Sequence, residues 1–292
     1  MNIKSHPLLP DWNEIRRSWE DLPLLTRGES KEIRIVDDAH VIVRMIPSLY
    51  SFTQNRSAVI EGTDTARLNS FRILSDVLAD AGLRMATLAF GSDYYITRRL
   101  RDNSVDHVPP IEVIVKSRHV GTPKHGLYKI SDHRTRDGGR IEPERAHVPY
   151  VRFDYTNPLK DDKGCRLRDE CLPTGLADRY IDTASAEKTA MSAFCALYAF
   201  LSRHGIRLDD ICLKIDHTGS IIFGEVSPDC MRAVWVGEAQ DFFGASGEDC
   251  SKDTFRAGSQ PEEVRHTYER FNRVLSTPVR STVSPFDCLS AA

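Results

Sequence analysis

The chain has 292 residues, of which 40% are hydrophobic and 28% are charged. This is the composition of an ordinary globular protein that is long enough to bury a sizeable core. The formal net charge of −3 argues against a general nucleic-acid-binding protein, which normally carries a strong basic excess. Small anionic ligands stay possible, because local clusters of arginine and lysine can act within a nearly neutral chain.

The N-terminal residues and the cysteines indicate where the protein works. Residues 1–25 mix proline, tryptophan and charged residues and lack the apolar segment of a secretory signal. The most apolar window, residues 191–201, is too short to span a bilayer. The seven cysteines show no Cys-x-x-Cys pairs, which is typical of reduced thiols and argues against a zinc site or a disulfide framework. We therefore expect a cytoplasmic protein with no membrane partner.

The N-terminal part of the chain predicts an extension followed by a hairpin. Residues 1–26 are the predicted extension, and the chain then turns at Gly28. Two runs of β-branched residues, 33–35 and 41–43, predict a β-hairpin. A glycine turn close to Lys31 can cover the phosphates of a nucleotide. An ordinary hairpin without a ligand is the alternative interpretation.

A helix and two strands are predicted next. Apolar residues at helical spacing over 68–81 predict a helix that ends at Gly82. Residues 94–96 and 111–115 predict strands. The second strand runs into 116–122, where two cations precede a glycine and a threonine. This segment can hold an anion, and a solvated strand end is the alternative.

The second half of the chain predicts two helices around a strand pair. An apolar stripe over residues 191–201 predicts a core helix. Residues 211–215 and 221–223 predict two strands that are joined by a glycine turn. The final helix is predicted to begin at a capping box formed by Ser259 and Glu262.

The stretch that follows residues 221–223 has the character of a site. It delivers Glu225, Ser227, Asp229 and Arg232 within a few positions of a buried strand. Two carboxylates, a hydroxyl and a guanidinium around a Ser-Pro-Asp turn can bind phosphate or metal. The alternative is an ordinary turn that leaves the core with a solvated arginine.

Five sequence blocks occur in an order that resembles the SAICAR synthetases (phosphoribosylaminoimidazole-succinocarboxamide synthases). The likeness extends over residues 27–275, almost all of the chain after the extension. One such block is a weak signal, but five in the order of the family are hard to produce by chance. The blocks are Arg27-Gly28-Glu29-Ser30-Lys31, Ser92-Asp93 to Leu100, Pro110-Ile111-Glu112 to Thr122, Gly224 to Arg232, and Ser251 to Arg256.

The resemblance implies an α+β fold of two lobes with a cleft between them. The implied lobes are a β-rich one over nucleotide at residues 27–115 and a larger α/β one for substrate and metal at 116–292. The implied activity joins the carboxylate of an aminoimidazole-like ribonucleotide to the amine of aspartate or a similar amino acid. ATP and Mg²⁺ are the implied cofactors. ATP first phosphorylates the carboxylate, and the amine then displaces phosphate from the acyl phosphate.

The resemblance also assigns site residues. Arginines suit the ribonucleotide because their planar fork holds phosphate or carboxylate oxygens with two hydrogen bonds. On the substrate side, the residue types of the family are kept at Arg118, Ser227, Asp229, Arg232 and Arg256. On the ATP side, the implied residues are Arg27, Gly28, Ser30 and Lys31.

The ATP side departs from the family in three places. Glu29 replaces the first lysine of the glycine turn. Gly224 replaces the aspartate of an Asp-Glu pair, or marks its deletion. The family has a Lys-x-Glu strand that supplies a cation and a magnesium carboxylate. Aligned from the preceding helix, this strand becomes Cys212-Leu213-Lys214, which leaves no carboxylate.

Two registers of this strand present different residues to the metal. Aligned from the turn at Gly219, the cation and the carboxylate fall on Lys214 and Asp216. A slip of two residues keeps the same side of a strand pointing inward. We prefer this register, in which Lys214 is the catalytic cation and Asp216 and Glu225 bind magnesium. The alternative presents Cys212 and Lys214, with the lysine ammonium in the position of the metal.

Three functions remain open on these residues. The first is the housekeeping synthetase, and the second is a ligase of a side pathway, such as nucleoside natural product synthesis, with another ring or amine. The third is a catalytically silent nucleotide-binding or regulatory protein. The expected partners are small-molecule ribonucleotide and amino-acid substrates, with no nucleic acid. A homo-oligomer is possible.

Overall fold

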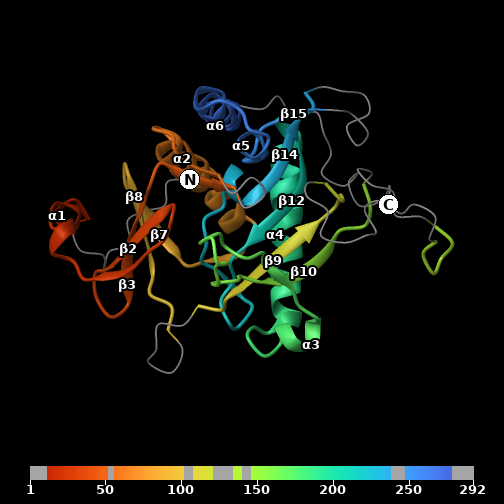
Figure 1. The fold of residues 1–292 in the computed structure, drawn as a ribbon, viewed down its shortest axis with the longest axis horizontal. Coiled ribbons are helices and arrows are strands. Elements are labelled where there is room, and N and C mark those ends of the chain that lie inside the picture. The colour runs from red at the N-terminus through yellow and green to blue at the C-terminus, as the bar shows by residue number, and fades with distance from the viewer. Residues whose placement is uncertain are drawn as a thin grey trace.

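The fold is built on two antiparallel sheets with helices between and around them (Figure 1). The structure is a computed structural model that describes residues 12–51, 56–101, 108–120, 134–139, 146–237 and 247–277. The five-stranded sheet at the left of the view comes from the N-terminal part of the chain, and the six-stranded sheet at the right comes from the C-terminal part. This mixed arrangement agrees with the predicted α+β class.

The five-stranded sheet has the order β1-β2-β3-β8-β7. Ile33 pairs with Val43 in an antiparallel register, which confirms the predicted hairpin. Helix α1 (Trp12–Arg17) and a 3-10 turn (Trp19–Asp21) precede this sheet. The strands are β1 (Leu24–Arg27), β2 (Lys31–Ile35), β3 (His40–Met45), β7 (Thr87–Phe90) and β8 (Tyr94–Arg98).

The six-stranded sheet has the order β11-β10-β9-β12-β14-β15. Helix α4 (Thr183–Arg203) packs across β9, β10 and β12, as expected of the predicted core helix. The Asp182 side chain caps this helix by accepting a hydrogen bond from the backbone N–H of Ser185 at 2.9 Å. The strands are β9 (Ile111–Lys116), β10 (Tyr150–Tyr155), β11 (Glu170–Cys171), β12 (Ile206–Leu213), β14 (Met231–Trp235) and β15 (Glu248–Asp249).

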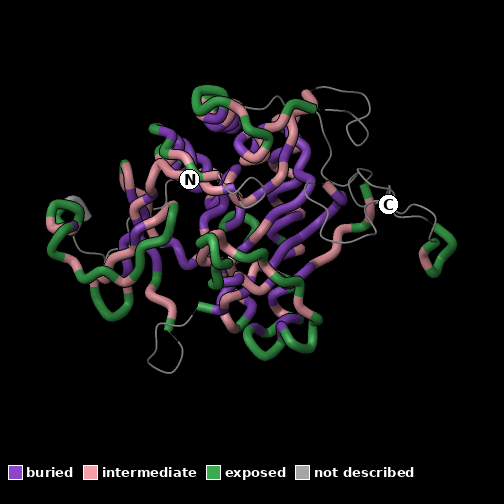
Figure 2. Tube along the Cα trace, viewed as in Figure 1, coloured by how far each residue is buried: buried purple, intermediate pink, exposed green. Residues whose placement is uncertain are grey.

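The six-stranded sheet has one apolar face and one polar face. Val113 and Val115 of β9 and Ile211 and Leu213 of β12 are fully buried in the main core, which α4 completes. Figure 2 shows these strands buried along most of their length. Side chains alternate along a strand, so the residues between these apolar ones point to the opposite face. That face carries Glu112, Lys116, Arg152, Asp210, Cys212 and Arg232.

Helix α2 (Thr63–Asp80) connects the two halves of the molecule. It packs against β3 of the first sheet, against α4, and against α6 (Pro261–Leu275). Its apolar stripe includes the fully buried Phe71 and Leu74, which confirms the predicted helix. The remaining elements are β4 (Ser48–Ser51), β5 (Arg56–Val59), β6 (Arg84–Met85), α3 (Thr174–Ala177), β13 (Ile221–Ile222), the 3-10 turn η3 (Pro228–Cys230) and α5 (Asp253–Arg256).

Two strand predictions need correction. The predicted first lobe includes residues 111–115, but they form β9, which lies between β10 and β12 in the second sheet. The boundary between the two sheets therefore lies before Ile111. The predicted hairpin of residues 211–215 and 221–223 reduces to one antiparallel bridge, Ile215 with Ile222, because β13 pairs in parallel with β6 instead.

The start of the last helix also differs from the prediction. Its capping box is formed by Gln260 and Glu263, one residue later than Ser259 and Glu262. Pro261 is the first helical residue, where its missing N–H has no cost. In the ranges that the structure describes, no helix is long and apolar enough to cross a membrane.

Candidate functional site

A cavity of about 370 Å³ opens on the polar face of the six-stranded sheet. Lys31 of β2 and Tyr50 of β4 close it from the N-terminal part of the chain. We call it the central cavity. It has eight cationic lining residues, Lys31, Lys116, Arg152, Arg168, Lys214, Arg232, Lys252 and Arg256, and five acidic ones, Glu112, Asp169, Asp210, Glu225 and Asp229.

Asp210 anchors the floor of the central cavity. Strand register places it opposite Lys116 of β9 on one side and opposite Arg232 of β14 on the other. Its Oδ2 accepts from Lys116 Nζ at 2.6 Å and from Arg232 Nη1 at 2.9 Å. Burial disfavours the carboxylate, but the two cations outweigh it and lower the pKa of Asp210 below its usual value. The sheet therefore holds both cations in fixed positions.

Arg232 continues this network toward α5. Its Nε donates to Asp253 Oδ2 at 2.9 Å, and Arg256 donates to the other oxygen of Asp253. Burial opposes the guanidinium charge, but Asp210 and Asp253 outweigh it and raise the pKa of Arg232. Two of the three predicted substrate arginines, Arg232 and Arg256, are thus brought to one wall of the central cavity, each held by a carboxylate.

Asp229 accepts hydrogen bonds from a second group of side chains around the cavity. Its Oδ2 accepts from Lys252 Nζ at 2.9 Å, and its Oδ1 accepts from Tyr268 Oη at 2.7 Å. Its backbone N–H donates to Ser227 Oγ at 3.2 Å, which caps the 3-10 turn. Burial disfavours the charge, but Lys252 and Arg67 lower the pKa of Asp229. The predicted Ser-Pro-Asp turn is present, and it fixes a carboxylate that is already paired.

Glu225 is a buried residue that lines the central cavity. Arg67 of α2 holds both of its oxygens, with Nε to Oε1 at 2.9 Å and Nη2 to Oε2 at 2.7 Å. Lys31 Nζ lies 2.7 Å from Oε2, and the Ser227 hydroxyl donates to Oε1. Burial favours the neutral acid, but Arg67 and Lys31 outweigh it and hold the pKa of Glu225 well below its usual range. The same carboxylate raises the pKa of Lys31 against the effect of burial.

Lys214 follows the end of β12 and points into the central cavity. Its Nζ donates to Thr156 Oγ1 at 2.9 Å and lies 3.4 Å from Glu112 Oε1. Its stem covers Gly224 so closely that a Cβ on Gly224 would lie 2.7 Å from the Lys214 Cβ. Cys212 lines the same cavity two residues earlier. The residues that face the cavity are therefore Cys212 and Lys214.

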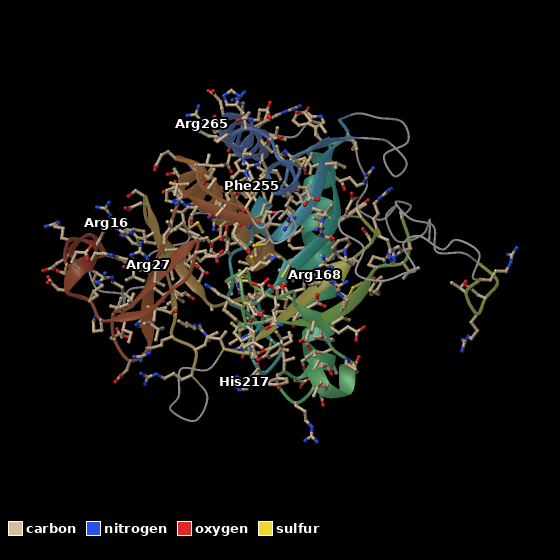
Figure 3. The ribbon with its side chains drawn as sticks, in the orientation of Figure 1. Arg16, Arg27, Arg168, His217, Phe255 and Arg265 are labelled. Atoms are coloured by element: carbon tan, nitrogen blue, oxygen red, sulfur yellow. The ribbon has the colours of Figure 1, made fainter. Side chains whose placement is uncertain are left out.

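The preferred register, with Asp216 in the metal site, is wrong. Asp216 Oδ1 accepts from the backbone N–H groups of Ser220 and Ile221 at 3.0 and 2.8 Å, and its Oδ2 accepts from Thr218 Oγ1 at 2.8 Å. It lines a different cavity of about 530 Å³, together with His217. Figure 3 shows His217 lower in the view than Arg168 of the central cavity. Asp216 stabilises a turn, because that turn needs an acceptor for its free N–H groups.

The glycine turn is formed as predicted, and one of its residues reaches the central cavity. Gly28 N–H donates to Lys31 O at 2.9 Å, which closes the turn between β1 and β2. Among the predicted ATP residues, Lys31 lines the cavity, whereas Arg27, Gly28 and Ser30 do not. Arg27 Nη1 lies 3.5 Å from Glu32 Oε2 on the neighbouring strand.

Arg118 lies beyond the wall of the central cavity. Its Nε is 3.2 Å from Asp209 Oδ1, and the residue is 5% exposed. It is not among the residues that line the cavity. Gly121 and Thr122, which complete its sequence block, lie outside the described residues. The structure therefore supports Arg118 as a buried ion-pair residue beside the site.

Comparison with known proteins identifies the fold. No protein-family model matches the chain. A SAICAR synthetase (Type-2) structure in complex with ADP superposes with a TM-score of 0.65 at 20% identity, and the match covers 88% of this chain and 99% of that one. The chain has the SAICAR synthetase fold.

Two curated relatives share detectable sequence similarity with this chain. The bifunctional cordycepin biosynthesis cluster protein 3 of Cordyceps militaris is 24% identical over 86% of this chain and 32% of its own length. The chain thus spans about a third of that relative. The phosphoribosylaminoimidazole-succinocarboxamide synthase of Sulfurisphaera tokodaii is 23% identical over 86% of this chain and 97% of its own length.

The SAICAR synthetase resemblance implies a magnesium ion, and the described residues do not fit one. No group of three or more His, Cys, Asp or Glu side chains in these ranges is arranged to hold a metal. Magnesium prefers carboxylate oxygens with room for water. Four cavity carboxylates, Glu112, Asp210, Glu225 and Asp229, pair with cations, and Asp169 accepts from the backbone N–H of Asn157. The predicted pair of Asp216 and Glu225 is not brought together.

Sequence reasoning missed several residues that line the central cavity, and the pattern of strand alternation contains the signal for them. The missed residues Glu112 and Ile114 share one face of β9, with period two, with Lys116, which the sequence marks as able to hold an anion. The missed Asp210 shares one face of β12 with Cys212, which the alternative register presents. A second signal is Arg67, which stands four residues before Phe71 on the apolar stripe of α2. A charged residue on a buried stripe needs a partner of opposite charge. The remaining missed cations are Arg152, Arg168 and Lys252.

Proposed function

We propose that the protein is an ATP-dependent ligase that forms an amide from the carboxylate of a heterocyclic ribonucleotide and the amine of an amino acid. The observation that carries the proposal is the cation-rich central cavity, which has three more cations than carboxylates. A triphosphate, a ribonucleotide phosphate and two carboxylates together need such a surplus. The SAICAR synthetase fold and the ADP complex of a structural relative support this proposal.

We place the nucleotide between the glycine hairpin and the end of β12. Lys31 of β2 and Lys214, which follows β12, both line the central cavity there. The ammonium group of a lysine binds phosphate as a point charge. The ribonucleotide lies along the wall of Arg232 and Arg256, whose planar guanidinium groups suit phosphate or carboxylate. Lys116 adds a positive charge next to Arg232, because both residues contact Asp210.

The reaction has two steps. A carboxylate oxygen of the ribonucleotide attacks the γ-phosphorus of ATP, the bond to the β-phosphate oxygen breaks, and ADP leaves. The amine nitrogen then attacks the carbonyl carbon of the acyl phosphate, and inorganic phosphate leaves with the electrons of the C–O bond while the amine loses a proton. The cavity residues hold the reacting groups in line and stabilise the negative charge as it moves.

A direct assay tests the proposal. Purified protein is incubated with ATP, aspartate and carboxyaminoimidazole ribonucleotide, both with and without Mg²⁺, and the products are measured by mass spectrometry. The proposal predicts ADP together with the succinyl amide in equal amounts. Other amines and heterocyclic carboxylates are then exchanged one at a time, because the ring and the amine can differ from those of purine synthesis. ADP without any amide over the whole panel contradicts the ligase.

A second candidate is a catalytically silent nucleotide-binding homologue. The observation that favours it is the pairing of the cavity carboxylates with cations of the chain itself. This candidate predicts nucleotide binding with neither ADP production nor amide formation. The same assay therefore separates the two candidates.

A further inference from the structure

Lys214 and Gly224 both line the central cavity and pack closely against each other. The lysine stem lies over the glycine backbone, and a Cβ added to Gly224 would approach it to 2.7 Å, which leaves no room for any side chain at position 224. An acidic side chain at position 224 is therefore excluded as long as the Lys214 stem keeps this path. In the register that the structure adopts, the SAICAR synthetase resemblance places a magnesium carboxylate at position 214 itself. The lysine at position 214 replaces a carboxylate with a cation. The glycine at position 224 leaves room for the stem of that lysine.

The ammonium group of Lys214 is available to a ligand. Its side chain is 31% exposed. Its Nζ donates to Thr156 Oγ1 at 2.9 Å and lies 3.4 Å from Glu112, which is 24% exposed. Partly exposed pairs of this geometry contribute little, so a phosphate oxygen can replace the Glu112 carboxylate at small cost. Lys31, in contrast, is fixed at 2.7 Å from the buried Glu225. Both lysines therefore line the same cavity. Lys31 is held by its ion pair with Glu225, whereas Lys214 can exchange Glu112 for a ligand.

Three of the five carboxylates of the cavity, Glu225, Asp229 and Asp210, are held by several contacts each and do not offer an alternative. The other two, Glu112 and Asp169, contact Lys214 and the backbone N–H of Asn157. Glu225 and Asp229 each accept from two or more side chains, and Asp210 accepts from two cations. A metal ion would have to displace a cation of the chain from each of these three carboxylates. Breaking a buried pair in this way is strongly unfavourable. The favourable partner for nucleotide phosphates in this cavity is therefore an ammonium group.

We propose that Lys214 takes the role of a divalent metal at the nucleotide phosphates, so that this chain binds nucleotide without Mg²⁺. The inference rests on the proposed function in one respect, since it takes the ligand to be an adenine nucleotide. It goes beyond that function because it assigns to a side chain the positive charge that neutralises the phosphates. Lysine supplies a fixed positive charge, and it needs no set of oxygen ligands around it.

The first test measures ADP binding by calorimetry in EDTA and in excess Mg²⁺. The inference predicts the same dissociation constant in both. In EDTA, Lys214→Met weakens ADP binding by about tenfold or more, because a charge-assisted hydrogen bond is lost. The matched control is Lys188→Met, which removes an exposed lysine of α4 that does not line the cavity, and it leaves ADP binding unchanged.

A second variant keeps the test decisive if Lys214→Met folds poorly. Lys214→Glu places a carboxylate beside Glu112, so its ADP binding should fail in EDTA and return with Mg²⁺. Binding of ADP by the unchanged protein in Mg²⁺ alone overturns the inference and leaves the ligase proposal standing. No ADP binding in either condition overturns both. Equal binding by Lys214→Met and the unchanged protein also overturns the inference, because the lysine then has no part in it.

Discussion

Arg67 and Glu225 form a buried, two-pronged ion pair although they are 158 positions apart in the chain. Both side chains are almost inaccessible, at 0% and 1% exposure. Arg67 belongs to α2, and Glu225 follows β13, so the pair fixes the helix to the loop that carries Ser227 and Asp229. Lys31 joins the same carboxylate from the glycine hairpin. One buried carboxylate thus holds three parts of the candidate site together.

Removing Arg67 should be costly. In Arg67→Met, the buried Glu225 keeps Lys31 and Ser227 and loses both hydrogen bonds from the guanidinium group. We expect the free energy of unfolding to fall by about 3–5 kcal/mol, the usual cost of breaking a buried pair. Urea unfolding of this variant is compared with Arg265→Met, which breaks an exposed pair with Glu262 and should cost about 1 kcal/mol or less. Equal losses in the two variants would contradict the structural role of the pair.

Stability should fall in acid partly through Glu225. Its folded-state pKa lies well below the usual value, so its contribution is present above the unfolded pKa of about 4.3 and is lost as the pH falls through the folded pKa. Asp210 and Asp229 have lowered pKa values and act with the same sign. The free energy of unfolding against pH should therefore decline more steeply below about pH 4.3 in the unchanged protein than in Glu225→Gln. Parallel profiles would refute this assignment.

Gly224→Ala tests the close approach of Lys214. The added Cβ would lie 2.7 Å from the Lys214 Cβ, so the strand end or the lysine must shift. We expect a loss of about 1–3 kcal/mol in the free energy of unfolding, as for other overpacked sites, together with weaker ADP binding. The control is Gly175→Ala in α3, where an added Cβ meets nothing within 4 Å. A Gly224→Ala variant as stable as this control would show that the stem of Lys214 takes another path.

Much of the fold can be predicted from the sequence because it depends on local patterns. The hairpin of β2 and β3, the helices α2 and α4, and the strand β9 follow from apolar spacing and glycine turns. The position of β9 does not follow, because strand pairing depends on contacts far apart in sequence. An apolar strand at residues 111–115 can extend either sheet, and the chain alone does not say which.

The candidate site also contains residues that the sequence predicts and one that it places wrongly. Motifs predict Lys31, Asp229, Arg232 and Arg256, and all four line the central cavity. The choice of Asp216 over Cys212 is wrong, because both registers point the same face of the strand inward. The structure decides it through the turn, in which Asp216 accepts the hydrogen bonds of Ser220 and Ile221. Such local satisfaction of a carboxylate has no distinct sequence signal beyond the Asp-x-Thr-Gly pattern.

Arg256 offers a cleaner test of substrate binding than Arg232. Arg232 holds Asp210 and Asp253 together, so its removal disturbs the network as well as the ligand. Arg256 is 28% exposed, and Asp253 keeps Arg232 when Arg256 is lost. We expect Arg256→Met to raise the KM for the ribonucleotide about tenfold or more, with little change in Tm. An unchanged KM would remove Arg256 from the binding site.

The central claim is that an acyl phosphate links ATP cleavage to amide formation. The most direct measurement uses a ribonucleotide whose carboxylate carries oxygen-18, with ATP and the amine that the assay identifies. Phosphorylation of the carboxylate followed by attack of the amine transfers one labelled oxygen from the carboxylate to inorganic phosphate, because the bridging C–O bond breaks in the second step. The account predicts labelled phosphate in the same amount as the amide. Amide formation with unlabelled phosphate, or ATP cleavage that leaves the carboxylate unchanged, would contradict it.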